Sequence, residues 1–140
     1  PDFEILEYVG DEKVLSEKGG YTEKDHTEGV SENTLSVYEE LKRRVLSVNS
    51  DLIFNPTKYY ISIKNVKNIA FIYLKKQRIS LVVLRPENEI RKIITKCEVK
   101  SLVQSVQGFY NGPCADIIIG DIGGMDEVVE LLRPLIESNE

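Results

Sequence analysis

The chain is 140 residues long, 41% of them hydrophobic and 29% charged, with a net charge of −5 at pH 7. These values are typical of one globular domain that buries a core of its own. They exclude a transmembrane protein, because no apolar run approaches the ~18 residues that a membrane-spanning helix needs. No charged start leads into an apolar stretch, as a secretory signal would. We therefore expect a cytoplasmic protein that makes no membrane contact.

The charge is strongly segregated along the chain. Residues 1–40 carry 12 acidic and 3 basic side chains (net −9), and residues 111–140 carry 7 acidic and 1 basic (net −6). Residues 41–110 carry 4 acidic and 14 basic side chains (net +10). An acidic protein therefore contains a strongly basic middle.

Residues 1–30 are acidic and only weakly periodic, although the pattern at residues 3–9 favours a short strand. Gly19-Gly20 interrupts whatever precedes it. The first residue is Pro1 rather than Met, which is typical of a fragment of a longer protein. We expect residues 1–20 to be a linker or the tail of an upstream domain, and residues 21–140 to be a single α+β accessory domain.

The clearest helix is predicted over residues 31–48. Ser31 is the expected N-cap, and Glu32 places a negative charge where the helix dipole favours one. Apolar side chains recur at spacings of three and four and form one stripe: Leu35, Tyr38, Leu41, Val45 and Val48. The helix is expected to end at Asn49, with Asn55-Pro56 in the loop that follows.

Three β-rich runs follow, at residues 58–64, 68–75 and 78–85. Their connections are only two or three residues long, which permits antiparallel hairpins but not parallel crossovers, so we expect a meander. The second run is apolar on both faces. It should therefore be a central strand, or else one of its faces meets something outside this chain.

The remaining chain is predicted to be mainly helical. Residues 87–95 and 98–107 have helical patterns, a glycine-rich turn surrounds Phe109-Tyr110, and residues 115–120 form a short strand. A last helix over residues 125–138 contains Pro134, which should kink or weaken it. The fold class is α+β: an N-terminal helix, a three-stranded antiparallel meander, a helical segment, a short fourth strand and a C-terminal helix packed on the sheet.

Residues for catalysis are scarce. His26 is the sole histidine, and Cys97 and Cys114 are far apart in sequence, so a zinc cluster is not expected; buried thiols are the preferred interpretation, with a disulfide left open. The glycine-rich run at residues 120–124 is interpreted as a strand-to-helix turn. Two acid-x-lysine triplets, at 40–42 and 98–100, lack the strand or the neighbouring carboxylates of a nuclease core. We expect no enzyme, no cofactor and no metal.

The basic segment is the feature with a functional interpretation. Its cations are interleaved with Tyr60, Phe71 and Tyr73, and such patterns suit phosphate contacts and base stacking. The cations are Lys58, Lys64, Lys67, Lys75, Lys76, Arg78, Arg85, Arg91, Lys92, Lys96 and Lys100. The alternative is that they protect sheet edges, or that the acidic ends of the chain neutralise them.

Three strings carry a resemblance to a known family: YTEKDH at 21–26, NPTKYYI at 55–61 and GFYNG at 108–112. They resemble an uncharacterised C-terminal domain of bacterial and archaeal proteins, often labelled "predicted transport protein" and frequently appended to restriction-type or nuclease-like domains. The resemblance covers about residues 21–138 and implies no established activity. Phe109-Tyr110 is bulkier than the turn that this family usually has.

Three hypotheses follow. The leading one is a non-catalytic accessory domain of a larger nuclease or restriction-type protein, which contacts nucleic acid through the basic meander. The contact residues it predicts are Lys58, Tyr60, Lys64, Arg78 and Tyr110. The second is a protein–protein interaction or oligomerisation module based on the apolar runs 69–74 and 115–120, and the third is a small-molecule pocket near Phe109-Tyr110. The partner could also be the upstream domain of the same chain, and the oligomeric state stays open.

Overall fold

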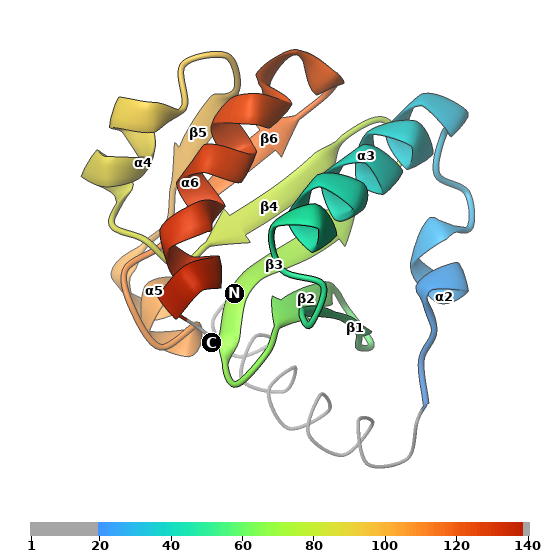
Figure 1. Ribbon diagram of the computed structural model, residues 1–140, viewed down its shortest axis with the longest axis horizontal. Helices are drawn as coiled ribbons and strands as arrows, with labels where there is room; N and C mark the ends of the chain where they lie inside the picture. The colour runs from blue at the N-terminus through green and yellow to red at the C-terminus, as the bar shows by residue number, and fades with distance from the viewer. Residues whose placement is uncertain (1–19, 139–140) are drawn as a thin grey trace.

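A six-stranded antiparallel sheet organises the chain, with the strand order β1-β2-β3-β4-β6-β5. The computed structural model describes residues 20–138, and Figure 1 shows α3, α4 and α6 on one side of the sheet. The α+β class is thereby confirmed. The strand predicted at residues 3–9, and nearly all of the predicted linker at 1–20, lie outside the described residues.

The elements follow one another in a simple order. The strands are β1 (Ile53–Pro56), β2 (Ile61–Lys64), β3 (Asn68–Leu74), β4 (Ile79–Val83), β5 (Glu98–Ser101) and β6 (Ala115–Ile119). The helices are α2 (Glu23–Thr27), α3 (Glu32–Val48), α4 (Glu87–Ile93), α5 (Gln104–Phe109) and α6 (Met125–Ser138), with a 3₁₀ turn, η1 (Ile122–Gly124), before the last.

Helix α3 begins and ends as its sequence predicts. The Ser31 hydroxyl accepts a hydrogen bond from the backbone N–H of Thr34 at 3.2 Å, so it caps the first turn. Tyr38, Leu41 and Val45 of the predicted stripe are buried against the sheet, together with Val37. Val48 is only half-buried, and Leu35 was wrongly included, since it lies half-buried on the outer side of the helix. In β2, Ile61 and Ile63 lie in the main core.

The meander has four strands rather than three. Residues 53–56, interpreted as a loop from the sequence, form β1, which pairs with β2 in the register Phe54↔Ile63. Pro56 ends this strand at the edge of the sheet, where a missing N–H costs little. Strand β3 lies between β2 and β4 and is buried on both faces, as its apolar pattern predicts.

The helix predicted over residues 98–107 is wrong in its first half. Residues Glu98–Ser101 form β5, which pairs with β6 in the register Val99↔Ile117. Only Gln104–Phe109 is helical, as α5. The alternation of Glu98, Val99 and Lys100 is compatible with a strand, but a strand forms here only because β6 provides an edge to pair with. Since β6 comes later in the chain, the local sequence does not show this partner.

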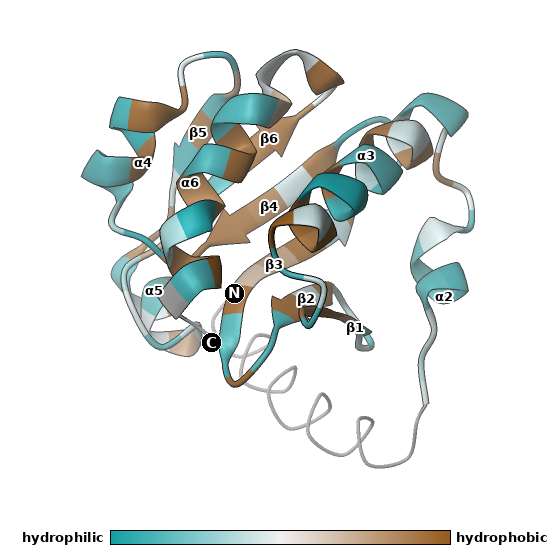
Figure 2. Ribbon diagram, in the orientation of Figure 1, coloured by the Kyte–Doolittle hydropathy of each residue, from teal (hydrophilic) through white to brown (hydrophobic). Residues whose placement is uncertain are grey.

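The main core lies between the sheet and the helices α3 and α6. Figure 2 shows apolar strands behind helices whose outer surfaces are hydrophilic. The helix predicted over residues 125–138 is confirmed as α6, and its Met125, Val128, Leu132 and Ile136 are fully buried. The helix also continues through Pro134 to its end at Ser138.

The opposite face of the sheet, here called the second face, carries a smaller cluster. Tyr60, Phe71, Val82, Tyr110 and Cys114 are buried there, and side chains of α5 pack against them. Two layers of apolar packing therefore enclose the centre of the sheet, which explains why β3 has no polar face.

Candidate nucleic-acid interface

The three predicted basic contact residues lie at two ends of the sheet. Lys58 is exposed in the loop between β1 and β2, and Arg78 is exposed in the turn between β3 and β4. Successive antiparallel hairpins turn at alternate ends, so these two cations share one end. Lys64 is half-buried where β2 ends, at the opposite end. The structure therefore separates Lys64 from the other two.

The two predicted aromatic contact residues are buried. Tyr60 is 2% exposed and Tyr110 is 7% exposed, and both rings pack on Phe71, with ring centroids 4.9 and 4.7 Å away. The Tyr110 hydroxyl also forms a short hydrogen bond with that of Tyr73. Base stacking needs an open ring face. In this arrangement the two rings instead pack the second face of the sheet.

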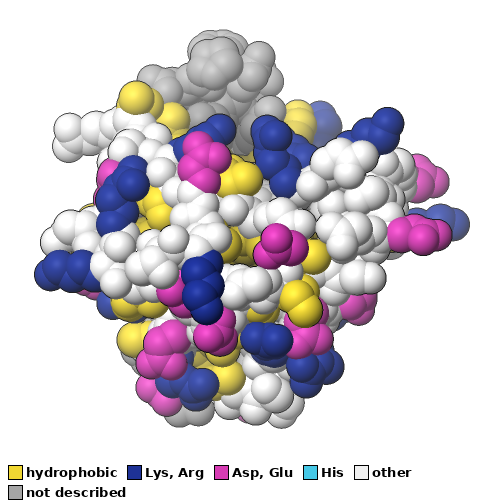
Figure 3. Space-filling model, turned by 90° about the horizontal axis from the view of Figure 1, so that it is seen from above, with side chains coloured by type: hydrophobic (Ala, Val, Ile, Leu, Met, Phe, Trp, Pro, Cys, Tyr) yellow, Lys and Arg dark blue, Asp and Glu magenta, His cyan; other side chains and the backbone are white. Residues whose placement is uncertain are grey.

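Many cations of the basic segment are neutralised within the domain. Glu40 accepts hydrogen bonds from both Arg43 and Arg44 at 2.5 Å, and Lys42 contacts Glu23 at 2.7 Å. On α4 and beside it, Arg85 pairs with Glu89 and Arg91 pairs with Glu87. Figure 3 shows basic and acidic side chains interspersed on the face that it views. Internal pairing therefore neutralises part of the basic segment.

Three further cations, Lys75, Arg78 and Lys100, lie on the second face and act on one carboxylate, Asp116. Val82 belongs to that face and pairs with Asp116, which in turn pairs with Lys100, so all three side chains lie on one side of the sheet. Ser80 and Arg78 precede Val82 by two and four residues and therefore share this side. Lys75 joins them across the turn, where its N–H donates to the Arg78 carbonyl at 2.9 Å.

We call this group, Lys75, Arg78, Ser80, Lys100 and Asp116, the cationic patch. At its centre the Ser80 hydroxyl donates a hydrogen bond to Asp116 Oδ1 at 2.6 Å. Burial raises the pKa of the Asp116 carboxyl, while Ser80 and the three cations pull that pKa down. Among residues 20–138, no carboxylate forms an ion pair with Lys75, Arg78 or Lys100.

The structure also puts the acid-x-lysine triplet 98–100 on strand β5, with Asp116 of β6 beside it. A helix at this position, as predicted from the sequence, would not have given the triplet a strand or a neighbouring carboxylate. Within the described part of the chain, however, no three His, Cys, Asp or Glu side chains come together as metal ligands do. Three cations next to Asp116 also oppose the binding of a dication there. The triplet consequently contributes one cation, Lys100, to the cationic patch.

Sequence reasoning did not single out Asp116, Ser80, Lys75 or Lys100 as site residues. One signal was available: Asp116 is the sole polar residue of β6, and alternation places it opposite the buried Ala115, Ile117 and Ile119. A carboxylate on an otherwise apolar strand is costly unless something holds it. The groups that stabilise the Asp116 carboxylate are Ser80 of β4 and Lys100 of β5. The sequence pattern of β6 alone does not reveal these neighbours.

The other candidate residues have structural roles. His26 is half-buried on α2, and its Nε2 donates to the Thr57 carbonyl at 2.5 Å, which ties α2 to the loop before β2. Cys97 and Cys114 are both free thiols, and burial raises the pKa of Cys114 to about 11. Asp121 caps η1 through the N–H of Gly123 at 2.8 Å, as expected of a strand-to-helix turn.

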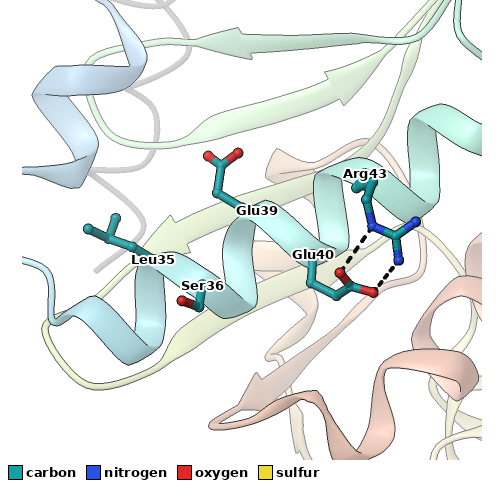
Figure 4. Close-up of a pocket in the computed structure, with 5 residues that line it drawn as sticks. All are labelled: Leu35, Ser36, Glu39, Glu40 and Arg43. Atoms are coloured by element: carbon teal, nitrogen blue, oxygen red, sulfur yellow. Dashed lines mark hydrogen bonds and ion pairs between the residues drawn. The ribbon is translucent and has the colours of Figure 1, made fainter.

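The two rival hypotheses find less support in the geometry. The apolar strands β3 and β6 are both interior strands of the sheet, and the centre of β3 is buried on both faces. The rings of Phe109 and Tyr110 pack on each other with centroids 4.8 Å apart. A depression lies instead on the outer side of α3, where Leu35, Ser36, Glu39, Glu40 and Arg43 line it; it is open to solvent (Figure 4).

No helix among residues 20–138 is both long and apolar enough to span a membrane. Comparison with known proteins gives a relative described as an uncharacterized protein of Haemophilus influenzae, 24% identical over 126 residues. The match covers 89% of this chain and 40% of that relative, so the chain spans well under half of its length. No solved structure matches. Residues 23–108 match a family described as a domain of unknown function, DUF5655, and the chain belongs to this family.

Proposed function

We propose that this domain is a non-catalytic accessory module that contacts the phosphates of nucleic acid through the cationic patch. In this proposal it serves a larger protein of the nuclease or restriction type. The H. influenzae relative extends well beyond the aligned region, which is consistent with an accessory role. Lys75, Arg78 and Lys100 carry the contact, and Lys58 at the same end of the sheet extends it.

One observation carries the proposal. Arginines elsewhere in the basic segment have carboxylate partners within 3 Å, yet the three cations of the patch have none among the described residues while they act on one shared carboxylate. Asp116 offsets only part of the repulsion among these three cations, and an anionic ligand relieves the rest. Phosphates bound by such cations release condensed counterions, which makes binding depend strongly on salt.

The test measures binding of the whole chain to a labelled single-stranded oligonucleotide by fluorescence anisotropy over a range of salt concentrations. We expect the logarithm of the association constant to fall linearly with the logarithm of salt concentration. Replacing Lys75, Arg78 and Lys100 by Gln, singly and together, should lower the slope by about 0.7 for each phosphate of the single strand that the variant no longer neutralises.

Lys92→Gln is the matched control, because Lys92 is exposed on α4 and lies outside the patch. It should leave the slope nearly unchanged. Equal effects of Lys92→Gln and of the patch variants would mean that net charge alone is responsible. Binding that does not respond to salt, or no binding at low salt, would overturn the proposed function.

A further inference from the structure

The carboxylate at the centre of the cationic patch is unexpected in a surface that only holds phosphates. Asp116 would repel a phosphate, and its partial burial makes its charge more costly still. The structure nevertheless fixes its orientation, because the Ser80 hydroxyl donates to Oδ1. Among the described residues nothing donates to Oδ2, and the side chain is half-buried rather than enclosed. Asp116 therefore presents an oriented acceptor atom.

The cations lie on two sides of this acceptor. Lys100 is the direct neighbour of Asp116 on the edge strand β5, about 5 Å away across the sheet. Arg78 lies in the turn just before the other neighbouring strand, β4, and four residues before the Asp116 partner Val82, which is about 13 Å along the strand direction. If the phosphates of a single strand contact Lys100 on one side and Arg78 on the other, a nucleotide between them lies over Asp116.

The chemistry of that nucleotide follows from the acceptor. A carboxylate accepts hydrogen bonds from the exocyclic amino group of cytosine. Thymine offers only one N–H, which stands between two carbonyl oxygens that a carboxylate repels. Unpaired bases expose their edges, so a single strand can contact the rim of the second face without an element that enters a groove.

We propose, building on the proposed function, that Asp116 with Ser80 recognises the amino edge of an unpaired base, so that the cationic patch is a single-strand site that prefers cytosine to thymine. Lys75, Arg78 and Lys100 supply the affinity for the backbone, and Asp116 supplies the discrimination. A carboxylate that merely lowered the repulsion among the cations would not discriminate between bases.

The experiment compares oligodeoxycytidine with oligothymidine of the same length, at neutral pH and fixed salt, by fluorescence anisotropy with the whole chain. We expect the cytosine oligomer to bind about fivefold or more tightly, the effect of one well-placed contact to a base edge. Asp116→Asn should remove that preference while it strengthens binding to oligothymidine, because one negative charge is removed. Asp51→Asn, an exposed carboxylate just before β1 at the far edge of the sheet from β5, is the matched control and should keep the preference.

A second variant keeps the charge. Ser80→Ala leaves the carboxylate in place but removes the hydroxyl that orients it, so the preference for cytosine should shrink while the affinity for oligothymidine stays nearly the same. Equal binding of both oligomers to the unmodified chain, or an equal rise for both in Asp116→Asn, would overturn the base recognition and leave the phosphate contact standing. If neither oligomer binds, both proposals are wrong.

Discussion

The surroundings of two carboxylates, Glu23 and Asp116, shift their pKa values in opposite directions. Although burial alone would raise the pKa of Glu23, hydrogen bonds from Lys42 and Tyr38 hold that pKa below its usual value. For Asp116, burial outweighs the hydrogen bond from Ser80 and the field of the three cations, so its pKa is raised. Ionised Glu23 therefore stabilises the fold, whereas ionised Asp116 costs stability that a ligand could recover.

The stability of Asp116→Asn should accordingly depend on pH. A raised pKa means that the folded state binds the proton more tightly than the unfolded state, so the cost of ionised Asp116 is fully present at neutral pH and disappears as the pH falls toward 3.8. We expect the variant to melt at a higher temperature than the unmodified chain at pH 7, and the difference to vanish in acid. Thermal unfolding at several pH values measures this, and a lower melting temperature at pH 7 would contradict it.

Tyr38→Phe should destabilise the fold through the Glu23 contact. The Tyr38 ring is fully buried, and its hydroxyl donates a short hydrogen bond to the Glu23 carboxylate. Removing that hydroxyl should lower the free energy of unfolding by about 1–2 kcal/mol at pH 7, and by less in acid, once the pH falls through the lowered pKa of Glu23 and the carboxylate is protonated. Urea denaturation gives the value. Tyr21→Phe is the control, since among residues 20–138 nothing hydrogen-bonds the Tyr21 hydroxyl, and it should change little.

At the scale of elements, short contacts fix how helices meet strands that lie far away in sequence. Glu127 in the first turn of α6 accepts from the N–H groups of Thr95 and Lys96 at 2.9 and 3.0 Å, which holds the segment that leads into β5. The edge of β5 is itself covered, because Arg91 Nη2 donates to the Val99 carbonyl at 3.0 Å. Covered edges discourage pairing with a second chain.

The junction between η1 and α6 should tolerate no side chain at Gly124. A Cβ built there would lie 2.8 Å from Cys97 Sγ and 3.2 Å from Lys96 Cβ, closer than atoms pack. Gly124→Ala should therefore lower the free energy of unfolding by about 1–3 kcal/mol. Combining it with Cys97→Ala should restore part of that stability in a double-mutant cycle, because the nearest atom is then gone.

Gly120→Ala is the control for this prediction. Nothing lies within 4 Å of a Cβ at position 120, so we expect a much smaller change. Chemical denaturation of the four variants provides the comparison. If Gly120→Ala and Gly124→Ala cost the same, the effect belongs to glycine in general rather than to the contact with Cys97.

At the scale of the whole molecule, folding brings together charges that the sequence keeps apart. Glu23 and Glu40 come from the acidic first part of the chain and pair with cations from the basic middle. Lys75, Arg78 and Lys100 have no carboxylate ion-pair partner among residues 20–138, and they share the second face with Asp116 and Glu98. This local group, and not the total charge of the basic segment, is the basis of the proposed function.

The main core consists of residues between Val37 and Ile136, so we propose that residues 21–140 suffice to fold. A protein that begins at residue 21 should unfold cooperatively in urea, with the far-ultraviolet circular dichroism of a mixed α and β fold. A non-cooperative transition, or the disappearance of the secondary structure, would contradict the expected boundary at residues 20–21.

Local patterns in the sequence predict much of this fold. The cap at Ser31, most of the apolar stripe of α3, the helix at residues 125–138 and the doubly apolar pattern of β3 depend on neighbours within a few residues, so they are visible before folding. The same reasoning missed β1 and assigned β5 to a helix, because an edge strand is stabilised by the strand beside it and has little pattern of its own.

Composition and periodicity are enough to establish the α+β class, the central place of β3 and the surplus of cations in the middle of the chain. Only the tertiary structure determines which cations pair with a carboxylate, that Tyr60 and Tyr110 are buried, and that Lys100 lies beside Asp116. The physical reason is that strand pairing and burial join residues from distant segments. Electrostatic interactions act through space between such residues, whereas helix caps and side-chain alternation act along the chain.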